Sequence, residues 1–221
     1  MAEKSKLFLV LCLHRSGSSA TAGVMHHLGI HMGNNLIPPS RHNKKGYFEN
    51  QDFVEMNDML LNSIGGGVWN PPTRDQVIKS SFPSEQIHAF LSNQVKPVWG
   101  LKDPRTLLTF EIWKPYFEEI ADITYVFVHR PFESSVYSLD YRQKKMNRKT
   151  ADEILTIYLK NLYYYRHNFG IDKQDIIDVY YEDMLKNPRP FVHEFNKRIG
   201  RNPENNLELV YEFLNNNLKH H

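Results

Sequence analysis

The sequence predicts a three-layer α/β fold, in which a mainly parallel central sheet carries helices on both faces. Residues 7–13 form a continuous apolar stretch, which is typical of a central strand covered on both sides. Later segments with strand character, at 98–101, 123–128 and 176–181, alternate with segments of helical periodicity. The length suits one such core and no change of composition divides it, so we expect a single domain over residues 1–221.

In the first half of the chain, the strand at 7–13 runs directly into a polar turn at 14–19. A helix is expected to follow through Leu28, where a glycine ends it. Residues 34–47 have the proline-rich and basic composition of a loop. A second helix is expected over 52–64, because apolar residues recur there at helical spacing before a run of three glycines.

In the second half, Pro83 suits the first turn of a helix that extends to about Asn93. Thr150 and Glu153 form a capping-box pattern, which predicts the start of a long helix to about residue 169. Further helices are expected after the strands, namely one to about Lys114, one that carries Ser134, Ser135 and Ser138, and several rich in Phe and Leu near the C-terminus.

The composition excludes several classes of function. With 27 Lys and Arg against 25 Asp and Glu, the net charge of +2 is too small to indicate binding to nucleic acid or to a membrane surface. Cys12 is the single cysteine, so no intrachain disulfide forms, and no Cys/His cluster has the spacing of a metal site. The apolar run at 7–13 is far shorter than the ~20 residues that span a bilayer. We therefore expect a cytoplasmic protein with no membrane span and no metal.

The turn after the first strand has the residues of a phosphate-binding loop. It reads Arg15, Ser16, Gly17, Ser18 and Ser19. A glycine permits close approach of a ligand to the backbone, the hydroxyls add donors, and the arginine adds a planar cation suited to paired oxygen atoms. The N–H groups and the dipole at the start of the following helix favour an anion at the same place. An alternative is a capped helix start beside an unrelated arginine.

This loop differs from the Walker A loop of magnesium-dependent nucleotide triphosphatases. The Walker A pattern places a glycine five residues before its second glycine and a lysine directly after it. Here those positions hold Cys12 and Ser18, and the cation precedes Gly17. An ordinary magnesium–nucleotide site is therefore not expected.

Three further polar segments follow the loop along the chain. They are the Lys-Asp-Pro-Arg segment within 100–105, the His-Arg-Pro segment at 129–131 with a serine at 138, and the Tyr-Glu-Asp segment within 179–184. Together the four segments resemble those of the sulfotransferases that use 3′-phosphoadenosine 5′-phosphosulfate (PAPS), in their bacterial form. The resemblance implies a P-loop NTPase-like fold, transfer of a sulfuryl group from PAPS, and adenosine 3′,5′-bisphosphate as the product.

The resemblance also implies nucleotide-binding roles. The loop 15–19 corresponds to the family's 5′-phosphosulfate loop, and Arg130 with Ser138 to its 3′-phosphate motif. Tyr181 resembles the family tyrosine near the adenine, although the residue types alone also allow a core aromatic on a buried strand. Two anion sites on one sheet edge, separated by the length of a nucleoside, would suit PAPS.

Sulfuryl transfer resembles phosphoryl transfer, so positioning and charge stabilisation should dominate, without a metal. By the resemblance, Arg15 neutralises the leaving phosphate and Lys102 contacts the transferred group. Pro104 stands where animal relatives have a histidine base, and Glu49 is our candidate base. Glu49 could instead cap the next helix. The remaining candidates for the base are Asp103, His14 and His42.

The acceptor should be a small molecule or a saccharide with a hydroxyl or an amine. Tyr47, Phe48 and Trp69 supply aromatic surface that suits a sugar, a phenol or an apolar alcohol. Two other functions remain open from the residues: a kinase-like phosphotransferase and a nucleotide-binding protein without catalytic activity.

Overall fold

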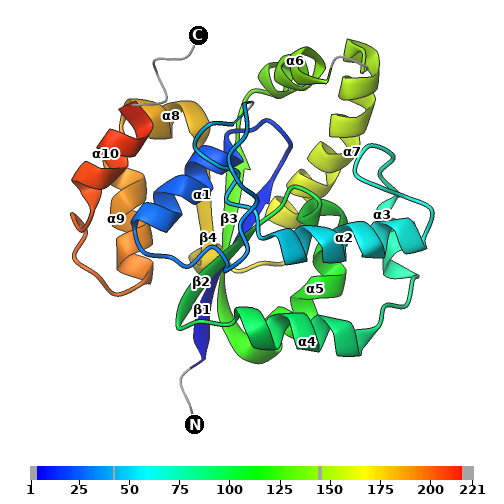
Figure 1. The fold of residues 1–221 in the computed structure, drawn as a ribbon, viewed down its shortest axis with the longest axis horizontal. Helices are drawn as coiled ribbons and strands as arrows, with labels where there is room; N and C mark the ends of the chain where they lie inside the picture. The colour runs from blue at the N-terminus through cyan, green and yellow to red at the C-terminus, as the bar shows by residue number, and fades with distance from the viewer. Residues whose placement is uncertain (1–3, 42, 144–145, 216–221) are drawn as a thin grey trace.

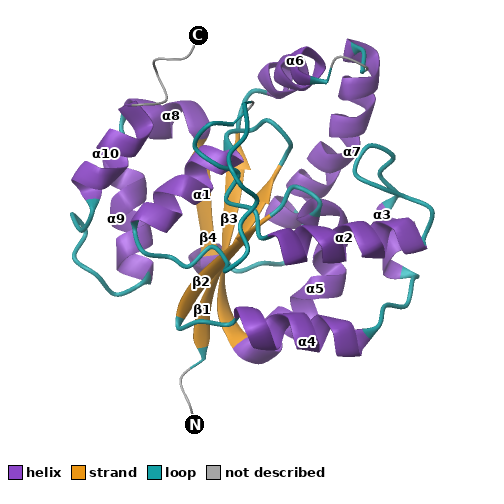
Figure 2. Cartoon of the chain, in the orientation of Figure 1, coloured by secondary structure: helices purple, strands orange, loops and turns teal. Residues whose placement is uncertain are grey.

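The computed structural model describes residues 4–41, 43–143 and 146–215. Within them, the centre is a four-stranded, all-parallel sheet with the order β2-β1-β3-β4 (Figures 1 and 2). The strands are β1 (Ser5–Cys12), β2 (Val98–Lys102), β3 (Ala121–His129) and β4 (Ile176–Tyr180). The predicted fold class is confirmed, and each predicted strand is present.

Helices cover both faces of the sheet, as Figure 1 shows. One face carries α1 (Ser18–His27), α8 (Tyr181–Lys186), α9 (Arg189–Arg198) and α10 (Leu207–Asn215). The other face carries α2 (Gln51–Ser63), α4 (Ser84–Gln94), α5 (Thr106–Ile120), α6 (Phe132–Arg142) and α7 (Arg148–His167). A short helix, α3 (Arg74–Ile78), and a 3₁₀ turn, η1 (Lys173–Asp175), lie in connections.

The apolar run of the first strand is continuous because both of its faces are buried. Successive side chains of a strand point to opposite faces, so alternate residues of β1 enter different cores. Leu7, Leu9 and Leu11 pack under α2, α4, α5 and α7, whereas Phe8, Val10 and Cys12 pack under α1, α9 and α10. Each such side chain contributes about 1.5–3 kcal/mol on burial, which explains why this strand holds the centre of the sheet.

The strand order creates a crevice at one edge of the sheet. The chain passes from β1 to β2 on one side, then returns past β1 to β3 on the other. The connections after β1 and β3 therefore lead to opposite faces, into α1 and α6. Ligands of open α/β sheets bind at the carboxyl ends of the strands at such a switch point. Both turns that the sequence singles out, after β1 and after β3, border it.

Two predicted helix starts are wrong in detail. The side chain of Asn147, not Thr150, is the N-cap of α7, since its Oδ1 accepts from the backbone N–H of Thr150 at 2.9 Å. The predicted capping box of Thr150 and Glu153 is therefore absent, because the amide oxygen of Asn147, the residue directly before the helix, takes the capping role. Pro83 precedes the first turn of α4 as its N-cap residue.

Two other boundaries and one short helix also differ from the sequence prediction. Helix α5 continues past Lys114 to Ile120 with Pro115 inside it. Strand β4 ends at Tyr180, and Tyr181 begins α8. Helix α3 was not predicted. None of the helices in the described part of the chain is both long and apolar enough to cross a membrane.

Candidate active site

The turn after β1 is folded by its own hydrogen bonds. Arg15 has φ 64°, a left-handed conformation that costs a non-glycine residue energy, and Gly17 has φ 88°. The Ser16 hydroxyl donates to the carbonyl of Leu13 at 2.8 Å, which closes the turn from inside. Helix α1 then begins at Ser18, directly after Gly17. The first N–H groups of a helix have no acceptor within it, so the turn presents donors to the crevice.

The turn after β3 contacts this first turn directly. Nη1 of Arg130 donates to the carbonyl oxygen of Arg15 at 2.8 Å, and Nε of Arg15 donates to Oγ of Ser138 at 3.0 Å. Arg15 thus meets Arg130 and Ser138, which lie 115 and 123 positions further along the chain, at one edge of the sheet. Of the three serines of α6, Ser138 is the one that bonds the Arg15 side chain. Ser135 is buried, with its Oγ 3.5 Å from the Arg15 carbonyl.

Tyr181 explains why position 17 is a glycine. Its ring lies against the Cα of Gly17, so that a Cβ there would come within 2.1 Å of the ring. The Arg130 guanidinium also lies over this ring, 5.1 Å from its centroid. Tyr181 is therefore a partly exposed residue at the site, not the core aromatic of a buried strand that the residue types also allowed.

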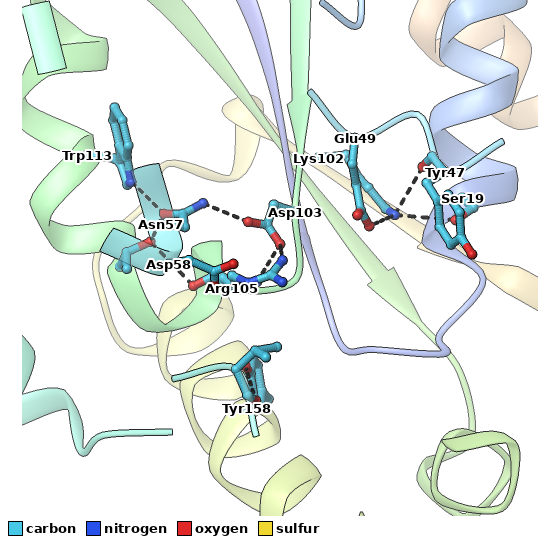
Figure 3. A network of polar contacts seen from close by, with 12 residues as sticks. Ser19, Tyr47, Glu49, Asn57, Asp58, Lys102, Asp103, Arg105, Trp113 and Tyr158 are labelled. Carbon is cyan, nitrogen blue, oxygen red and sulfur yellow. Dashed lines mark hydrogen bonds and ion pairs between the residues drawn. The ribbon is translucent and has the colours of Figure 1, made fainter. Parts of the chain in front are cut away.

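Lys102 and Glu49, proposed separately from the sequence, form an ion pair in which Nζ lies 2.5 Å from Oε1 (Figure 3). Lys102 is almost fully buried, with 2% of its side chain exposed. Its ammonium group also donates to the carbonyl oxygen of Tyr47 at 3.2 Å and to Oγ of Ser19 at 3.3 Å. A buried ammonium group requires such partners to offset its lost hydration, and three segments distant in the chain are joined around it.

Glu49 does not cap the following helix. The N-cap of α2 is Asn50, whose side chain accepts from the N–H of Phe53 at 3.2 Å. The Glu49 carboxylate instead points at Lys102, with 14% of its side chain exposed. This geometry leaves the carboxylate accessible from the crevice.

Asp103, an alternative base, belongs to a structural network on the other side of β2 (Figure 3). Its two oxygens accept from Asn57 at 2.8 Å and from the side chain of Arg105 at 2.9 Å. Burial raises the pKa of Asp103, while Arg105 opposes that rise. Asn57 in turn accepts from Trp113 at 2.8 Å. Asp103 is fully buried, so it fixes the segment after β2 and thereby holds Lys102.

His14, another alternative base, borders the crevice as a neutral ring. Burial lowers the pKa of His14 well below its usual value, and the cations Arg105 and Lys102 lower it further. Its ring packs between Trp69 and Tyr158, at centroid distances of 5.0 and 5.1 Å. Its Nε2 is buried and has no hydrogen-bond partner in the described part of the structure. His42 lies outside the described residues.

The crevice is a cavity of about 280 Å³ with a strongly positive lining. The charged residues that line it are Arg15, Lys45, Glu49, Lys102, Arg130 and Arg142. The other lining residues are His14, Gly17, Ser18, Ser19, Ala20, Asn43, Gly46, Tyr47, Pro104, Tyr181 and Phe213. Five cations therefore face a single carboxylate, which is the electrostatic character of a site for a polyanion.

Most of the sequence-predicted site residues line this one cavity. Two do not: the Ser16 side chain is buried beneath the turn, and Ser138 faces an adjoining hollow that shares Arg130 with the cavity. Sequence reasoning missed Lys45 and Phe213. Lys45 lies in a basic run, and Phe213 on the last helix gives no local signal, because only folding brings α10 beside α1.

Two negative findings limit the chemistry among the described residues. They contain no group of three or more His, Cys, Asp or Glu side chains arranged to hold a metal ion. Burial raises the pKa of the Cys12 thiol to about 12, so this group stays protonated beneath the loop and is not a nucleophile.

The fold and the site define an α/β protein with a glycine- and serine-containing turn at the switch point of its sheet. No protein-family model matches the chain, and no curated protein matches its sequence with significance. Solved structures do resemble it. The sulfotransferase domain of an olefin synthase from Synechococcus superposes with a TM-score of 0.58 at 18% identity, over 100% of this chain and 86% of that one.

Two other solved structures are similar over nearly the whole chain. A sulfotransferase from Mycobacterium avium gives a TM-score of 0.55 at 13% identity, over 100% of this chain and 69% of that one. The sulfotransferase domain from the curacin biosynthetic pathway gives 0.53 at 16% identity, over 96% and 79%. The chain therefore has the fold of bacterial sulfotransferase domains, which is P-loop-like.

Proposed function

We propose that this chain is a PAPS-dependent sulfotransferase that transfers a sulfuryl group to a hydroxyl or an amine of its acceptor. The observation that carries the proposal is the contact between Lys102 and Glu49 inside a cavity that Arg15 and Arg130 also line. A cation for the transferred group, a carboxylate for the acceptor proton and two arginines for phosphates are the groups that this reaction requires.

The donors at the site fit PAPS. Arg15 and the N–H groups that open α1 suit the 5′-phosphosulfate. Arg130 and Ser138 are assigned to the 3′-phosphate. Nε of Arg130 is buried without a hydrogen-bond partner in the described structure, 3.4 Å from Glu182 but outside hydrogen-bond geometry, so it retains a donor for an anion. We place the adenine near Tyr181.

When bound, PAPS supplies an activated sulfuryl group whose leaving group is a phosphate. Lys102 and Arg15 stabilise the negative charge that develops on the oxygens around the sulfur and on the departing phosphate. Oε1 of Glu49 accepts from Lys102, and we assign the second oxygen, Oε2, to the acceptor. Oε2 accepts the hydroxyl proton as the acceptor oxygen bonds to sulfur. The network around Asp103 keeps Lys102 from moving during this transfer.

Calorimetry with adenosine 3′,5′-bisphosphate and AMP tests the proposal. We expect the bisphosphate to bind with micromolar affinity and AMP to bind much more weakly, because AMP lacks the group assigned to Arg130. Equal affinities for the two nucleotides would contradict the proposal.

The transfer itself is tested with radiolabelled PAPS and pooled hydroxyl and amine acceptors. Transfer of label without magnesium is the expected result. Magnesium-dependent turnover of ATP would instead support a kinase-like phosphotransferase. Tight binding of the bisphosphate without transfer to any pool would support a nucleotide-binding protein without catalytic activity.

A further inference from the structure

The cavity holds one guanidinium that the proposed nucleotide site does not use. Arg142 is the last residue of α6 and lines the cavity. Its Nη2 donates to the hydroxyl of Tyr47 at 2.9 Å, and its guanidinium lies 5.5 Å from the centroid of that ring. Among the described residues it has no carboxylate within ion-pair distance, whereas Lys102 and Arg130 each have one.

The position of Arg142 is fixed by contacts on the loop that precedes α2. The Tyr47 hydroxyl accepts from Arg142 and lies 2.6 Å from Oγ of Ser40, to which it can donate its own hydrogen. An arginine at the end of a helix commonly interacts with the last carbonyls of that helix. Here the guanidinium is directed to Tyr47 instead, which keeps its other N–H groups at the cavity.

The charges of the cavity lining favour an anion beside Arg142. Burial lowers the pKa of Arg15, and the nearby Arg142 and Arg130 lower it further. Two guanidinium groups that repel each other in a half-buried site are stabilised when an oxyanion lies between or beside them. The single carboxylate of the lining, Glu49, is already paired with Lys102.

Tyr47 also relates Arg142 to the reacting groups. Its carbonyl oxygen accepts from Lys102 at 3.2 Å, while its ring hydroxyl accepts from Arg142. The pair of Lys102 and Glu49 is therefore separated from Arg142 by about the span of one tyrosine residue. His14 borders the same space as a neutral ring.

We propose that the acceptor carries an oxyanion, either a carboxylate or a sulfate or phosphate ester, which Arg142 binds while the acceptor hydroxyl lies at Glu49. This inference rests on the proposed function. It narrows the acceptor to hydroxyl compounds that carry an acidic group at the end of the molecule away from the reacting hydroxyl. Arg142 is the residue that selects them, through a fork of donors that suits paired oxygens.

Calorimetry on the protein saturated with adenosine 3′,5′-bisphosphate tests this, with pairs of probes of which one member carries the acidic group and the other is neutral. The carboxylate arm compares 4-hydroxyphenylacetate with 4-hydroxyphenylacetamide, and the sulfate arm compares N-acetylglucosamine 6-sulfate with N-acetylglucosamine. We expect the anionic member of at least one pair to bind about tenfold more tightly, the range of a hydrogen bond to a charged group. The arm that shows the preference identifies the kind of oxyanion.

Two variants assign the effect to the arginine. Arg142→Gln should abolish the preference for the anion, and Arg142→Lys should retain part of it, since the charge remains without the planar fork. Arg189→Gln is the matched control: Arg189 is 54% exposed on α9, pairs with Glu204 and does not line the cavity. It should keep the full preference.

Affinity for the bisphosphate is measured for every variant and separates the two proposals. If the wild-type protein does not bind the bisphosphate, the proposed function is wrong. If it does, any of three results overturns the inference about the acceptor. Neither acid binds, or the acids and their neutral partners bind equally, or Arg142→Gln lowers the affinity for the bisphosphate instead of the preference for the acid. The last result would assign Arg142 to the nucleotide.

Discussion

Nζ of Lys102 lies 2.5 Å from Oε1 of Glu49, although the two residues are 53 positions apart. The lysine ends a strand and the glutamate lies in the loop before a helix, so only the folding of the chain brings them together. A buried ammonium and a carboxylate in contact hold each other in place, and each loses its partner when the other is replaced. The first prediction concerns this pair.

Glu49→Gln should reduce turnover by at least 10²-fold, in the range of general-base catalysis, because an amide cannot accept the acceptor proton. Affinity for adenosine 3′,5′-bisphosphate should change little, since Glu49 is not assigned to the nucleotide. Turnover with labelled PAPS and calorimetry measure the two effects.

Glu55→Gln is the control for this substitution. Glu55 is exposed on α2, where it accepts from Gln51, and it does not line the cavity. Its variant should retain full turnover. Full turnover by Glu49→Gln would show that another group takes the proton.

The fold could be predicted from the sequence because its signals are local. The apolar run of β1 predicts a buried strand, and the glycine after it predicts a turn, from neighbouring residues alone. The prediction of a capping box at Thr150 was wrong because Asn147, three residues earlier, caps the helix instead.

The site was only partly predictable, because its pairings are not local. Glu49 and Lys102 were each singled out as candidates from the sequence, but their contact depends on the packing of the loop before α2 onto the end of β2. The Gly17–Tyr181 contact and the entry of Phe213 into the lining likewise depend on how α8 and α10 pack. No spacing in the sequence encodes such distances.

The second prediction separates the two proposed phosphate sites. Arg130→Gln should weaken binding of adenosine 3′,5′-bisphosphate by about 10–100-fold, the range for a hydrogen bond to a charged group. AMP should be affected far less, because it lacks the 3′-phosphate. Calorimetry with both nucleotides gives the ratio of the two affinities.

Ser138→Ala is a milder version of the same test. It removes the hydroxyl that accepts from Arg15 and should narrow the preference for the bisphosphate without abolishing it. An equal loss of affinity for both nucleotides in Arg130→Gln would mean that Arg130 acts only by holding the turn through the Arg15 carbonyl.

The third prediction is a pH dependence of stability that comes from His14. Its pKa is lowered in the folded protein, chiefly by burial, so below about pH 6.5 the unfolded chain binds a proton that the folded chain does not. Stability should therefore fall as the pH falls from 6.5 toward the lower, folded-state pKa. One pH unit below 6.5 the loss is about 1 kcal/mol.

Urea unfolding at pH 7.5 and pH 5.5 measures this loss. His14→Gln should show a smaller difference between the two pH values, because the replacement does not titrate. His193→Gln is the control, since His193 is exposed beside Glu204 and away from the cavity. An unchanged pH difference in His14→Gln would show that other groups cause it.

The fourth prediction concerns Gly17, the glycine of the proposed phosphate loop. In Gly17→Ala the new Cβ would meet the Tyr181 ring at 2.1 Å, and φ 88° is unfavourable for alanine by about 1–2 kcal/mol. The turn and the tyrosine must separate, and the backbone donors at the start of α1 move with the turn. Affinity for both adenosine 3′,5′-bisphosphate and AMP should then fall, unlike the selective loss in Arg130→Gln.

Gly170→Ala controls for the strain alone. Gly170 has φ 85° but nothing within 4 Å of its added Cβ, and it lies outside the cavity lining. Its variant should lose a similar backbone energy in urea unfolding and keep its nucleotide affinity. If Gly17→Ala binds both nucleotides as well as Gly170→Ala does, the close packing of Tyr181 on the loop has no role in shaping the phosphate site.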